Sequence, residues 1–151
     1  KKALDADFKI SKEDYFGENG GIVITNPNAP TGIAESREWV EEIIKANQDS
    51  VVIVDEAYVD FGGETCLPLI EKYDNVLVVH TFSKSRSLAG LRVGVGMGSK
   101  KLIKYLNDVK FSINSFLDRS CKLDLIALSM ATKISLSLQL PSWYFATNIR
   151  M

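Results

Sequence analysis

Three short runs of consecutive apolar residues recur in the first half of the chain, and each ends where polar residues begin. They cover residues 21–25, 51–54 and 76–80. Continuous apolar runs rich in β-branched side chains are typical of strands that helices bury on both faces. Between them, residues 34–46 place apolar side chains on one stripe of a helix with charges around it, and residues 67–73 predict a shorter helix. This alternation predicts an α/β fold, a mostly parallel sheet with crossover helices.

The second half of the chain is patterned differently. Residues 92–98 alternate glycine with larger residues, which predicts a strand that permits close backbone approach. Residues 101–110 predict a helix with a buried apolar stripe. Beyond residue 118 the pattern is mixed, because Leu117, Cys121, Leu125 and Leu128 repeat as in a helix while residues 134–140 alternate as in a strand. We therefore expect one folded unit over residues 1–117 and a divergent segment over 118–151, helical at first.

Polar residues that could take part in binding or catalysis follow each of the three predicted strands. Right-handed crossovers bring the carboxyl ends of parallel strands to one edge of the sheet, so Asn28, Asp55 and Lys84 are expected to meet there, where such sheets bind ligands. After the third strand, the hydroxyls of Thr81 and Ser83 and the guanidinium of Arg92 could hold an anion and leave the amine of Lys84 to attack a carbonyl carbon. A phosphorylated aldehyde has both of these groups.

Composition narrows the class of protein. The chain has 151 residues, enough for one domain with a core, and 18 Lys+Arg balance 19 Asp+Glu without a long block of like charge, so nucleic-acid and membrane partners are disfavoured. Cys66 and Cys121 stand apart and, with a single histidine, match no common zinc pattern; we expect reduced thiols in a cytoplasmic protein and no metal. Residues 1–3 include no initiator Met and no apolar leader, so no secretory signal is expected in the sequence present and the true start is expected upstream.

Three motifs together carry a family resemblance. N-P-N-A-P-T-G at residues 26–32, V-D-E-A-Y at 54–58 and T-F-S-K-S-R-S-L-A-G-L-R-V-G at 81–94 occur in this order. The chain resembles the large domain of fold-type I aminotransferases that use pyridoxal 5'-phosphate (PLP), and most closely the histidinol-phosphate aminotransferase branch. The resemblance covers about residues 8–108 and implies that residues 1–117 are the central part of a PLP-binding large domain, a fragment of a longer enzyme.

The resemblance also implies a role for each site residue. Lys84 would be the Schiff-base lysine and then the general base, and the carboxylate of Asp55 would keep the pyridine nitrogen protonated. Asn28 and Tyr58 would hydrogen-bond the phenolate oxygen of the cofactor; Asn28 is chosen because Ala29 stands where relatives often carry a second Asn. The cofactor-binding set is Asn28, Asp55, Tyr58, Thr81, Ser83, Lys84 and Arg92. An amino donor, 2-oxoglutarate as the 2-oxo acid, and a homodimer are the implied partners.

Other interpretations remain open at this point. Asp55 could merely end a strand, Asn28 could form an Asx-turn, and Tyr58 could be a half-buried core tyrosine. The chain could be a catalytically silent α/β fragment, or a nucleotide-binding doubly wound domain, although G-V-G-M-G at residues 94–98 lacks the spacing of a dinucleotide loop. His80, inside an apolar run, is expected to be a satisfied core residue, and Arg86 to be solvated or at an interface.

Overall fold

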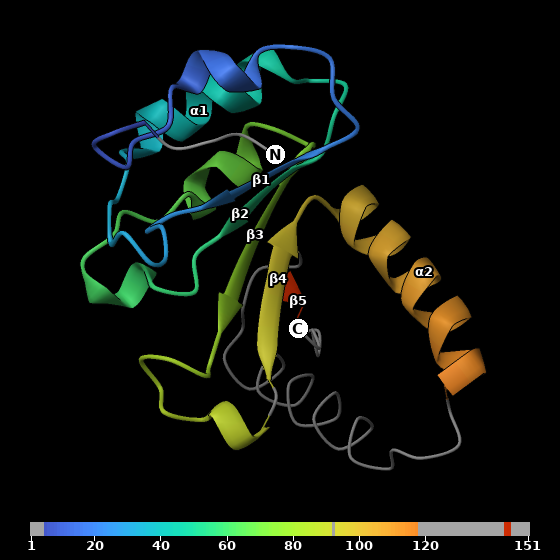
Figure 1. The fold of residues 1–151 in the computed structure, drawn as a ribbon. Coiled ribbons are helices and arrows are strands. Elements are labelled where there is room, and N and C mark those ends of the chain that lie inside the picture. Colours follow the sequence, from blue (N-terminus) through green and yellow to red (C-terminus); the bar gives the residue numbers. More distant parts are fainter. Residues whose placement is uncertain (1–4, 92, 118–143, 146–151) are drawn as a thin grey trace.

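A computed structural model describes residues 5–91, 93–117 and 144–145 of the chain. Figure 1 shows a mixed sheet with the order β1-β2-β3-β4-β5. β1, β2 and β3 are parallel, whereas β4 is antiparallel to β3 and β5 is antiparallel to β4. The strands are β1 (Ile22–Thr25), β2 (Val52–Asp55), β3 (Val76–Thr81), β4 (Gly94–Gly98) and β5 (Tyr144–Phe145). The predicted α/β fold with a mostly parallel sheet is confirmed, and the strand expected over residues 92–98 is present as β4.

The register of the parallel strands places their carboxyl ends at one edge. Thr25 at the end of β1 pairs with Asp55, and Asp55 pairs with Val79 of β3. β3 continues for two more residues to Thr81, which pairs with Gly94 at the start of β4. The loops that follow the three strands therefore leave the sheet at the same edge, which is the geometry that the sequence predicts for the site.

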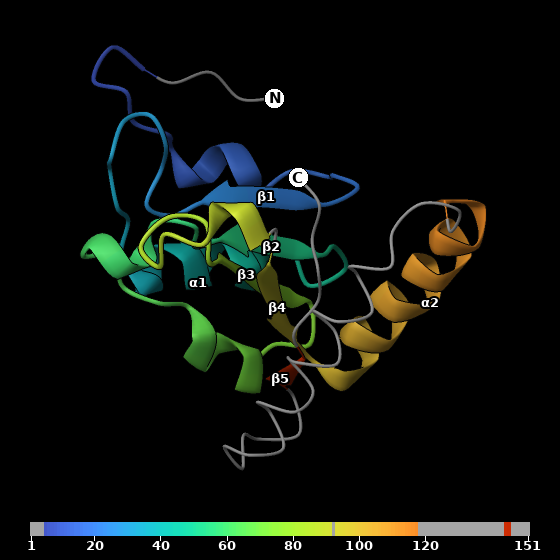
Figure 2. The same cartoon turned by 90° about the horizontal axis from the view of Figure 1, so that it is seen from below.

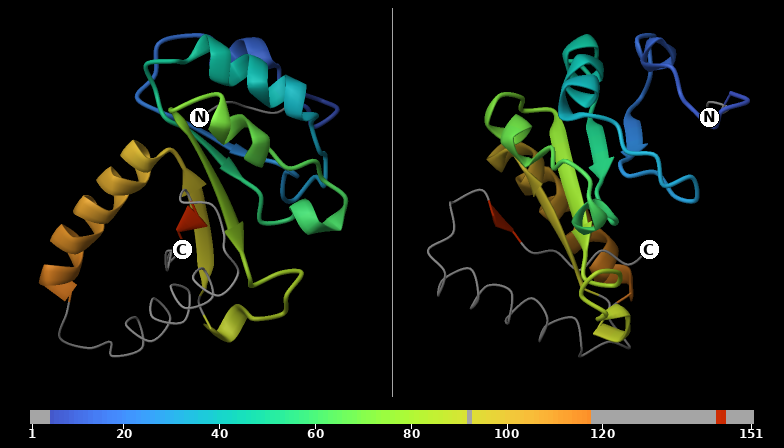
Figure 3. Two further views of the ribbon diagram at one scale, coloured as in Figure 1. Left: turned by 180° about the vertical axis from the view of Figure 1, so that it is seen from behind. Right: turned by 90° about the vertical axis from the view of Figure 1, so that its left-hand side faces the viewer.

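Helices lie at the two sides of this sheet. α1 (Arg37–Ala46) begins after Ser36, whose hydroxyl accepts a hydrogen bond from the backbone N–H of Trp39 at 3.2 Å. Its side chains Val40, Ile43 and Ile44 are fully buried, in one core with the apolar residues of β1 and β2. α2 (Lys100–Leu117) follows β4, and Figures 1, 2 and 3 agree that it lies far from α1. Short 3₁₀ turns complete the described chain: η1 (Lys12–Tyr15), η2 (Val59–Phe61), η3 (Leu67–Glu71) and η4 (Ala89–Leu91).

Three predicted helices differ in their details. The helix expected over 34–46 begins at Arg37, because Ser36 adopts an extended backbone and caps it. The helix expected over 67–73 is the five-residue 3₁₀ turn η3, with a proline in its first positions; a segment this short gains little from α-helical hydrogen bonds. The helix expected over 101–110 extends to Leu117. The second crossover thus consists of 3₁₀ turns, and not of an α-helix.

Glycines let β3 and β4 approach closely. A Cβ atom on Gly98 would lie 2.9 Å from the carbonyl oxygen of Val76, and one on Gly94 would lie 3.0 Å from that of His80. These glycines belong to a strand that pairs with β3 along its length. The Gly-x-Gly-x-Gly run is therefore a strand and not a phosphate-binding loop, which removes the sequence feature that suggested a nucleotide.

Some predictions fall outside the described residues. They concern Arg92, Cys121, the helical repeat beyond Asp118 and the strand expected over 134–140. Within the described residues, no helix combines the length and the apolar character needed to cross a bilayer.

Candidate active site

Lys84 and Tyr58 come together at the carboxyl edge of the sheet. Tyr58 lies three residues after β2 and Lys84 three residues after β3. The Nζ atom of Lys84 is 5.2 Å from the centroid of the Tyr58 ring, within the range of a cation–π contact. The Lys84 residue is exposed and Tyr58 is half-buried. An amine that can be reached from solvent is thus held beside a phenol.

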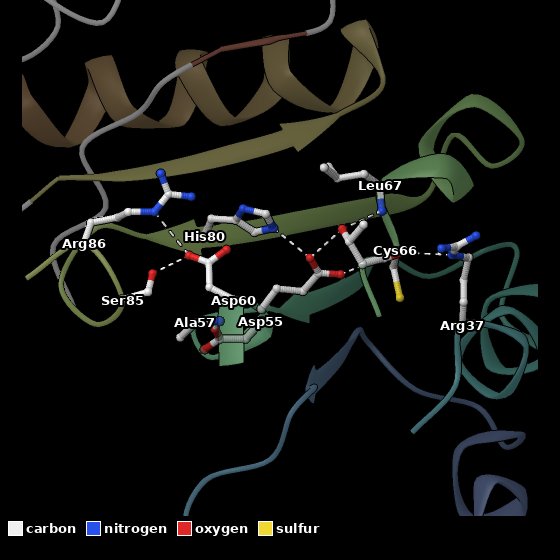
Figure 4. A network of polar contacts seen from close by, with 11 residues as sticks. Arg37, Asp55, Ala57, Asp60, Cys66, Leu67, His80, Ser85 and Arg86 are labelled. Carbon is white, nitrogen blue, oxygen red and sulfur yellow. Dashed lines mark hydrogen bonds and ion pairs between the residues drawn. The ribbon is translucent and has the colours of Figure 1, made fainter. Parts of the chain in front are cut away.

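Asp55 is the last residue of β2 and lies next to both β1 and β3. Its Oδ1 atom accepts a hydrogen bond from the backbone N–H of Ala57 at 3.0 Å, which starts the turn toward Tyr58. Figure 4 shows Asp55 and Ala57 together at this turn. The turn-forming role and the cofactor role predicted for Asp55 are compatible, because a carboxylate has two oxygens and Ala57 uses one of them.

Asn28 lies in the loop after β1, and its side chain is held by two threonines. Its Oδ1 atom accepts a hydrogen bond from Thr25 Oγ1 at 2.7 Å, and its Nδ2 atom donates to Thr31 Oγ1 at 2.7 Å. Pro27 brings this loop against the loop after β2, since a Cβ atom on Gly63 would lie 2.9 Å from the Pro27 ring. Asn28 is therefore fixed at the same edge as Asp55 with one amide hydrogen left for a ligand.

Thr81 and Ser83 form the start of the loop that carries Lys84. Thr81 Oγ1 accepts a hydrogen bond from the backbone N–H of Ser83 at 3.1 Å, and the backbone N–H of Leu88 donates to the carbonyl of Phe82 at 2.9 Å. Both hydroxyl residues are half-buried. The Thr81 hydroxyl is thus held against the backbone of Ser83, and the phosphate-binding roles of Thr81, Ser83 and Arg92 stay predictions.

A buried carboxylate that the sequence did not single out lies beside the site. Glu56 is 1% exposed and follows Asp55 directly. Its Oε2 atom is 2.7 Å from His80 Nε2 and accepts from Thr65 Oγ1 at 2.8 Å, while Oε1 accepts from the backbone N–H of Cys66 at 2.5 Å. His80 therefore has the polar partner that was expected, but its side chain is half-buried and does not belong to the core. The hydrogen bonds of Glu56 thus connect the end of β2 with β3 and with the segment before η3, next to Asp55 in the sequence.

Burial at this network changes the chemistry of Cys66. The side chain is fully buried beside Glu56. Burial, with the nearby Glu56 carboxylate, raises the pKa of the Cys66 thiol to about 12. The thiol is therefore neutral at physiological pH, and a structural role is favoured over a nucleophilic one.

A second missed residue, Asp60, contacts the loop that carries Lys84. Its Oδ2 atom accepts hydrogen bonds from Ser85 Oγ and from Arg86 Nε, the latter at 3.3 Å. Figure 4 shows Ser85 and Arg86 converging on Asp60. Arg86 is 60% exposed, so the expectation of solvation holds for most of its surface, but the ion pair with Asp60 was not foreseen.

One cavity of the described chain includes a predicted site residue, Asn28. It measures about 120 Å³, and Thr25, Asn28, Thr31 and Trp39 are among its lining residues. Asp55, Tyr58 and Lys84 do not line it. Asn28 therefore lines this cavity and also follows β1 at the carboxyl edge of the sheet.

The residues at the edge fit the functional groups of PLP. The edge offers an amine, a carboxylate, a phenol, an amide and two hydroxyls, from the loops after three adjacent strands. An aldehyde needs the amine, a pyridinium nitrogen needs the carboxylate, a phenolate oxygen needs donors, and a phosphate needs hydroxyls. Each group of the cofactor has a matching residue type in the structure.

Comparisons with known proteins agree with this arrangement. The family model described as "Aminotransferase class I and II" matches residues 2–137. A curated relative from Lactococcus lactis subsp. cremoris (strain SK11), named histidinol-phosphate aminotransferase, is 62% identical over 116 residues, which are 77% of this chain and 33% of the relative. The chain spans about a third of the length of the curated relatives it matches.

Two solved structures are similar in fold to this chain. The histidinol-phosphate aminotransferase from Clostridium acetobutylicum is similar with a TM-score of 0.60 and 26% identity, over 66% of this chain and 32% of that chain. A PLP-bound C-S lyase from Staphylococcus hominis is similar with a TM-score of 0.54 and 26% identity, over 66% of this chain and 28% of that chain.

Proposed function

This chain belongs to the class I and II aminotransferases, and on that premise we propose that it carries the lysine-bearing core of a PLP-dependent transaminase. The observation that carries the proposal is the meeting of Lys84 and Tyr58 at the edge of the sheet where β2 ends in Asp55. Residues 1–117 would be the central part of the PLP-binding large domain, and residues 118–151 a divergent segment after it.

The residues at the edge would each bind a different group of the cofactor. Asp55 would face the pyridine nitrogen and keep it protonated, because a carboxylate favours the charged form of a neighbouring base. Tyr58 and Asn28 would donate hydrogen bonds to the phenolate oxygen. Thr81, Ser83 and Arg92 would hold the phosphate, Arg92 with two parallel hydrogen bonds. When bound, the cofactor supplies the electron sink that stabilises negative charge at the substrate carbon.

Lys84 would have two roles. Its amine would hold the cofactor through the aldehyde carbon, with loss of the aldehyde oxygen as water, and as a free amine it would move a proton from the substrate Cα atom. The Tyr58 ring lies against this amine, which supports a role for the ring in holding Lys84 at the edge between these steps.

The substrate is proposed from the relatives. Relatives named histidinol-phosphate aminotransferase at 55–62% identity support exchange of an amino group between histidinol phosphate and 2-oxoglutarate. A homodimer and a cytoplasmic location would accompany this function in the whole protein. Activity of a longer polypeptide that contains this chain, measured on histidinol phosphate and on aromatic amino acids, tests the substrate; a large preference for aromatic amino acids would contradict it.

A labelling experiment tests the site directly. PLP is added to the protein, the imine is reduced with borohydride, and the modified lysines are identified by peptide mapping. We expect the adduct on Lys84, loss of this adduct in Lys84→Ala, weaker labelling in Arg92→Ala, and no change in Lys101→Ala, an exposed lysine on α2. An adduct spread evenly over many lysines and insensitive to Arg92→Ala would instead support a second candidate, a catalytically silent α/β fragment. The observation behind this candidate is that the chain spans about a third of the length of its relatives.

A further inference from the structure

The turn after β2 contacts the Lys84 loop at two separate points. Tyr58, just before η2, places its ring beside the Lys84 amine. Asp60, inside η2, accepts hydrogen bonds from the next two residues of the loop, Ser85 and Arg86. The turn thus contacts the loop through an aromatic ring at Lys84 and through a carboxylate at the two residues that follow Lys84.

The structure of this turn fixes the spacing of the two contacts. The backbone N–H of Phe61 donates to the carbonyl of Tyr58 at 3.0 Å, and the ring centroids of Tyr58 and Phe61 are 6.1 Å apart. Gly62 ends the turn with a φ of 112°, a left-handed conformation that favours glycine. Tyr58 and Asp60 are therefore carried by one short rigid element and contact the loop together.

The Lys84 loop itself has few other restraints. Residues 86–91 are exposed, and Lys84 is exposed as well. Two backbone hydrogen bonds restrain it: the N–H of Ser87 donates to the carbonyl of Lys84 at 3.0 Å, and the N–H of Leu88 donates to the carbonyl of Phe82, just after β3, at 2.9 Å. In the described part of the chain, the side-chain hydrogen bonds that join residues 84–91 to another element are those to Asp60.

On these observations we propose that Asp60 is a positioning residue for Lys84, acting through Ser85 and Arg86 to hold the lysine over Tyr58. The inference rests on the function proposed for Lys84. The hydrogen bonds from Ser85 and Arg86 lower the pKa of the Asp60 carboxyl, so it stays ionised and accepting at neutral pH. Arg86 and His80 are the charged or titratable groups that act on Asp60.

This role differs from a contribution to overall stability. Asp60 is 39% exposed and Arg86 is 60% exposed, and ion pairs with such exposure contribute little to folding because water screens them. A catalytic amine is more demanding, since a small displacement from its working position lowers reactivity strongly. We therefore expect Asp60 substitutions to change the behaviour of Lys84 far more than the unfolding of the chain.

Two measurements on Asp60→Ala, Asp60→Asn and the control Asp49→Asn test the proposal. The control residue is an exposed acid in the turn that follows α1. The first measurement is hydrogen exchange at the Ser87 amide, compared with the Val78 amide inside β3. The second is the yield of reduced PLP adduct on Lys84.

For Asp60→Ala we expect about fivefold faster exchange at Ser87 and about fivefold less adduct on Lys84. A change of this size corresponds to the free energy that one or two exposed hydrogen bonds contribute. Exchange at Val78 should not change. Asp60→Asn keeps an acceptor for Ser85 and should lie between Asp60→Ala and the unmodified protein, while Asp49→Asn should match the unmodified protein.

Each other outcome has a definite meaning. If Asp60→Ala matches the unmodified protein in both measurements, or if exchange rises equally at Ser87 and Val78, the positioning role is wrong. If the unmodified protein forms no selective adduct on Lys84, the proposed function fails, and the exchange rates at Ser87 and Val78 still decide whether Asp60 holds the loop.

Discussion

The Nζ atom of Lys84 lies 5.2 Å from the centroid of the Tyr58 ring, although 26 positions separate the two residues in the sequence. The contact exists because β2 and β3 are neighbouring parallel strands, so the loops that leave their carboxyl ends meet. Each residue lies three positions beyond its strand. The amine and the phenol are therefore placed together by the sheet itself.

Substitution of Tyr58 should weaken the Lys84 adduct in two steps. Tyr58→Phe removes the hydroxyl proposed to bind the cofactor, which we expect to reduce PLP affinity about fivefold, the size of one hydrogen bond. Tyr58→Leu also removes the ring face, worth about 0.5–1 kcal/mol to a nearby cation, and should reduce affinity further by about two- to fivefold. Titration with PLP followed by borohydride measures both. Tyr105→Phe, on the exposed face of α2, is the control, and equal affinity of Tyr58→Phe and the unmodified protein would contradict the role of the hydroxyl.

Removal of the buried Glu56 carboxylate should destabilise the fold. Glu56→Ala leaves His80, Thr65 Oγ1 and the backbone N–H of Cys66 without their acceptor, so we expect the free energy of unfolding to fall by about 3 kcal/mol. Glu56→Gln keeps an acceptor oxygen and should lose less. Urea unfolding measures the change, and Glu71→Gln, at an exposed position, should stay within about 0.5 kcal/mol. A Glu56→Ala protein as stable as Glu71→Gln would show that the network contributes nothing.

The raised pKa of Cys66 predicts a loss of stability at alkaline pH. The thiol has its ordinary pKa of 9.0 in the unfolded chain and a pKa of about 12 in the folded protein. Its contribution is therefore fully present below pH 9 and is lost as the pH rises from 9 toward 12, by about 1.4 kcal/mol at pH 10. Urea unfolding of the unmodified protein and of Cys66→Ala at pH 8 and pH 10 isolates this effect. The stability difference between them should shrink at pH 10; a constant difference would mean that the thiol titrates normally.

Substitution of Gly98 should disturb the pairing of β3 with β4. An added Cβ atom would lie 2.9 Å from the carbonyl oxygen of Val76, a backbone atom that can move only with β3. We expect Gly98→Ala to lower the free energy of unfolding by about 1–3 kcal/mol. Gly20→Ala is the matched control, because no atom lies within 4 Å of its added Cβ. Equal stability of the two variants by urea unfolding would show that β4 adjusts without strain.

Local pattern was sufficient for the parallel strands because burial on both faces leaves a continuous apolar run. Residues 21–25, 51–54 and 76–80 match β1, β2 and β3 to within one residue at each end. Helix types and ends were less predictable: a side-chain cap set the start of α1, and a short proline-containing segment became a 3₁₀ turn instead of an α-helix. These outcomes depend on a few hydrogen bonds at each end, which hydrophobic periodicity does not report.

The sequence by itself determined the edge of the sheet where the candidate site residues lie and the types of residue found there. Alternating strands and helices predict a parallel sheet with right-handed crossovers, so the placement of Asn28, Asp55 and Lys84 at one edge could be derived from the sequence. Asp60 offered only a weak signal, an acid two positions after Tyr58, and Glu56 none, because a glutamate is rarely expected to be buried. Only the tertiary structure joined Glu56 to His80 and Asp60 to Ser85 and Arg86, contacts that span 24 to 26 positions. Partners at such distances depend on how loops from neighbouring strands fold against each other, and this is decided by packing across the sheet and not by the order of residues along the chain.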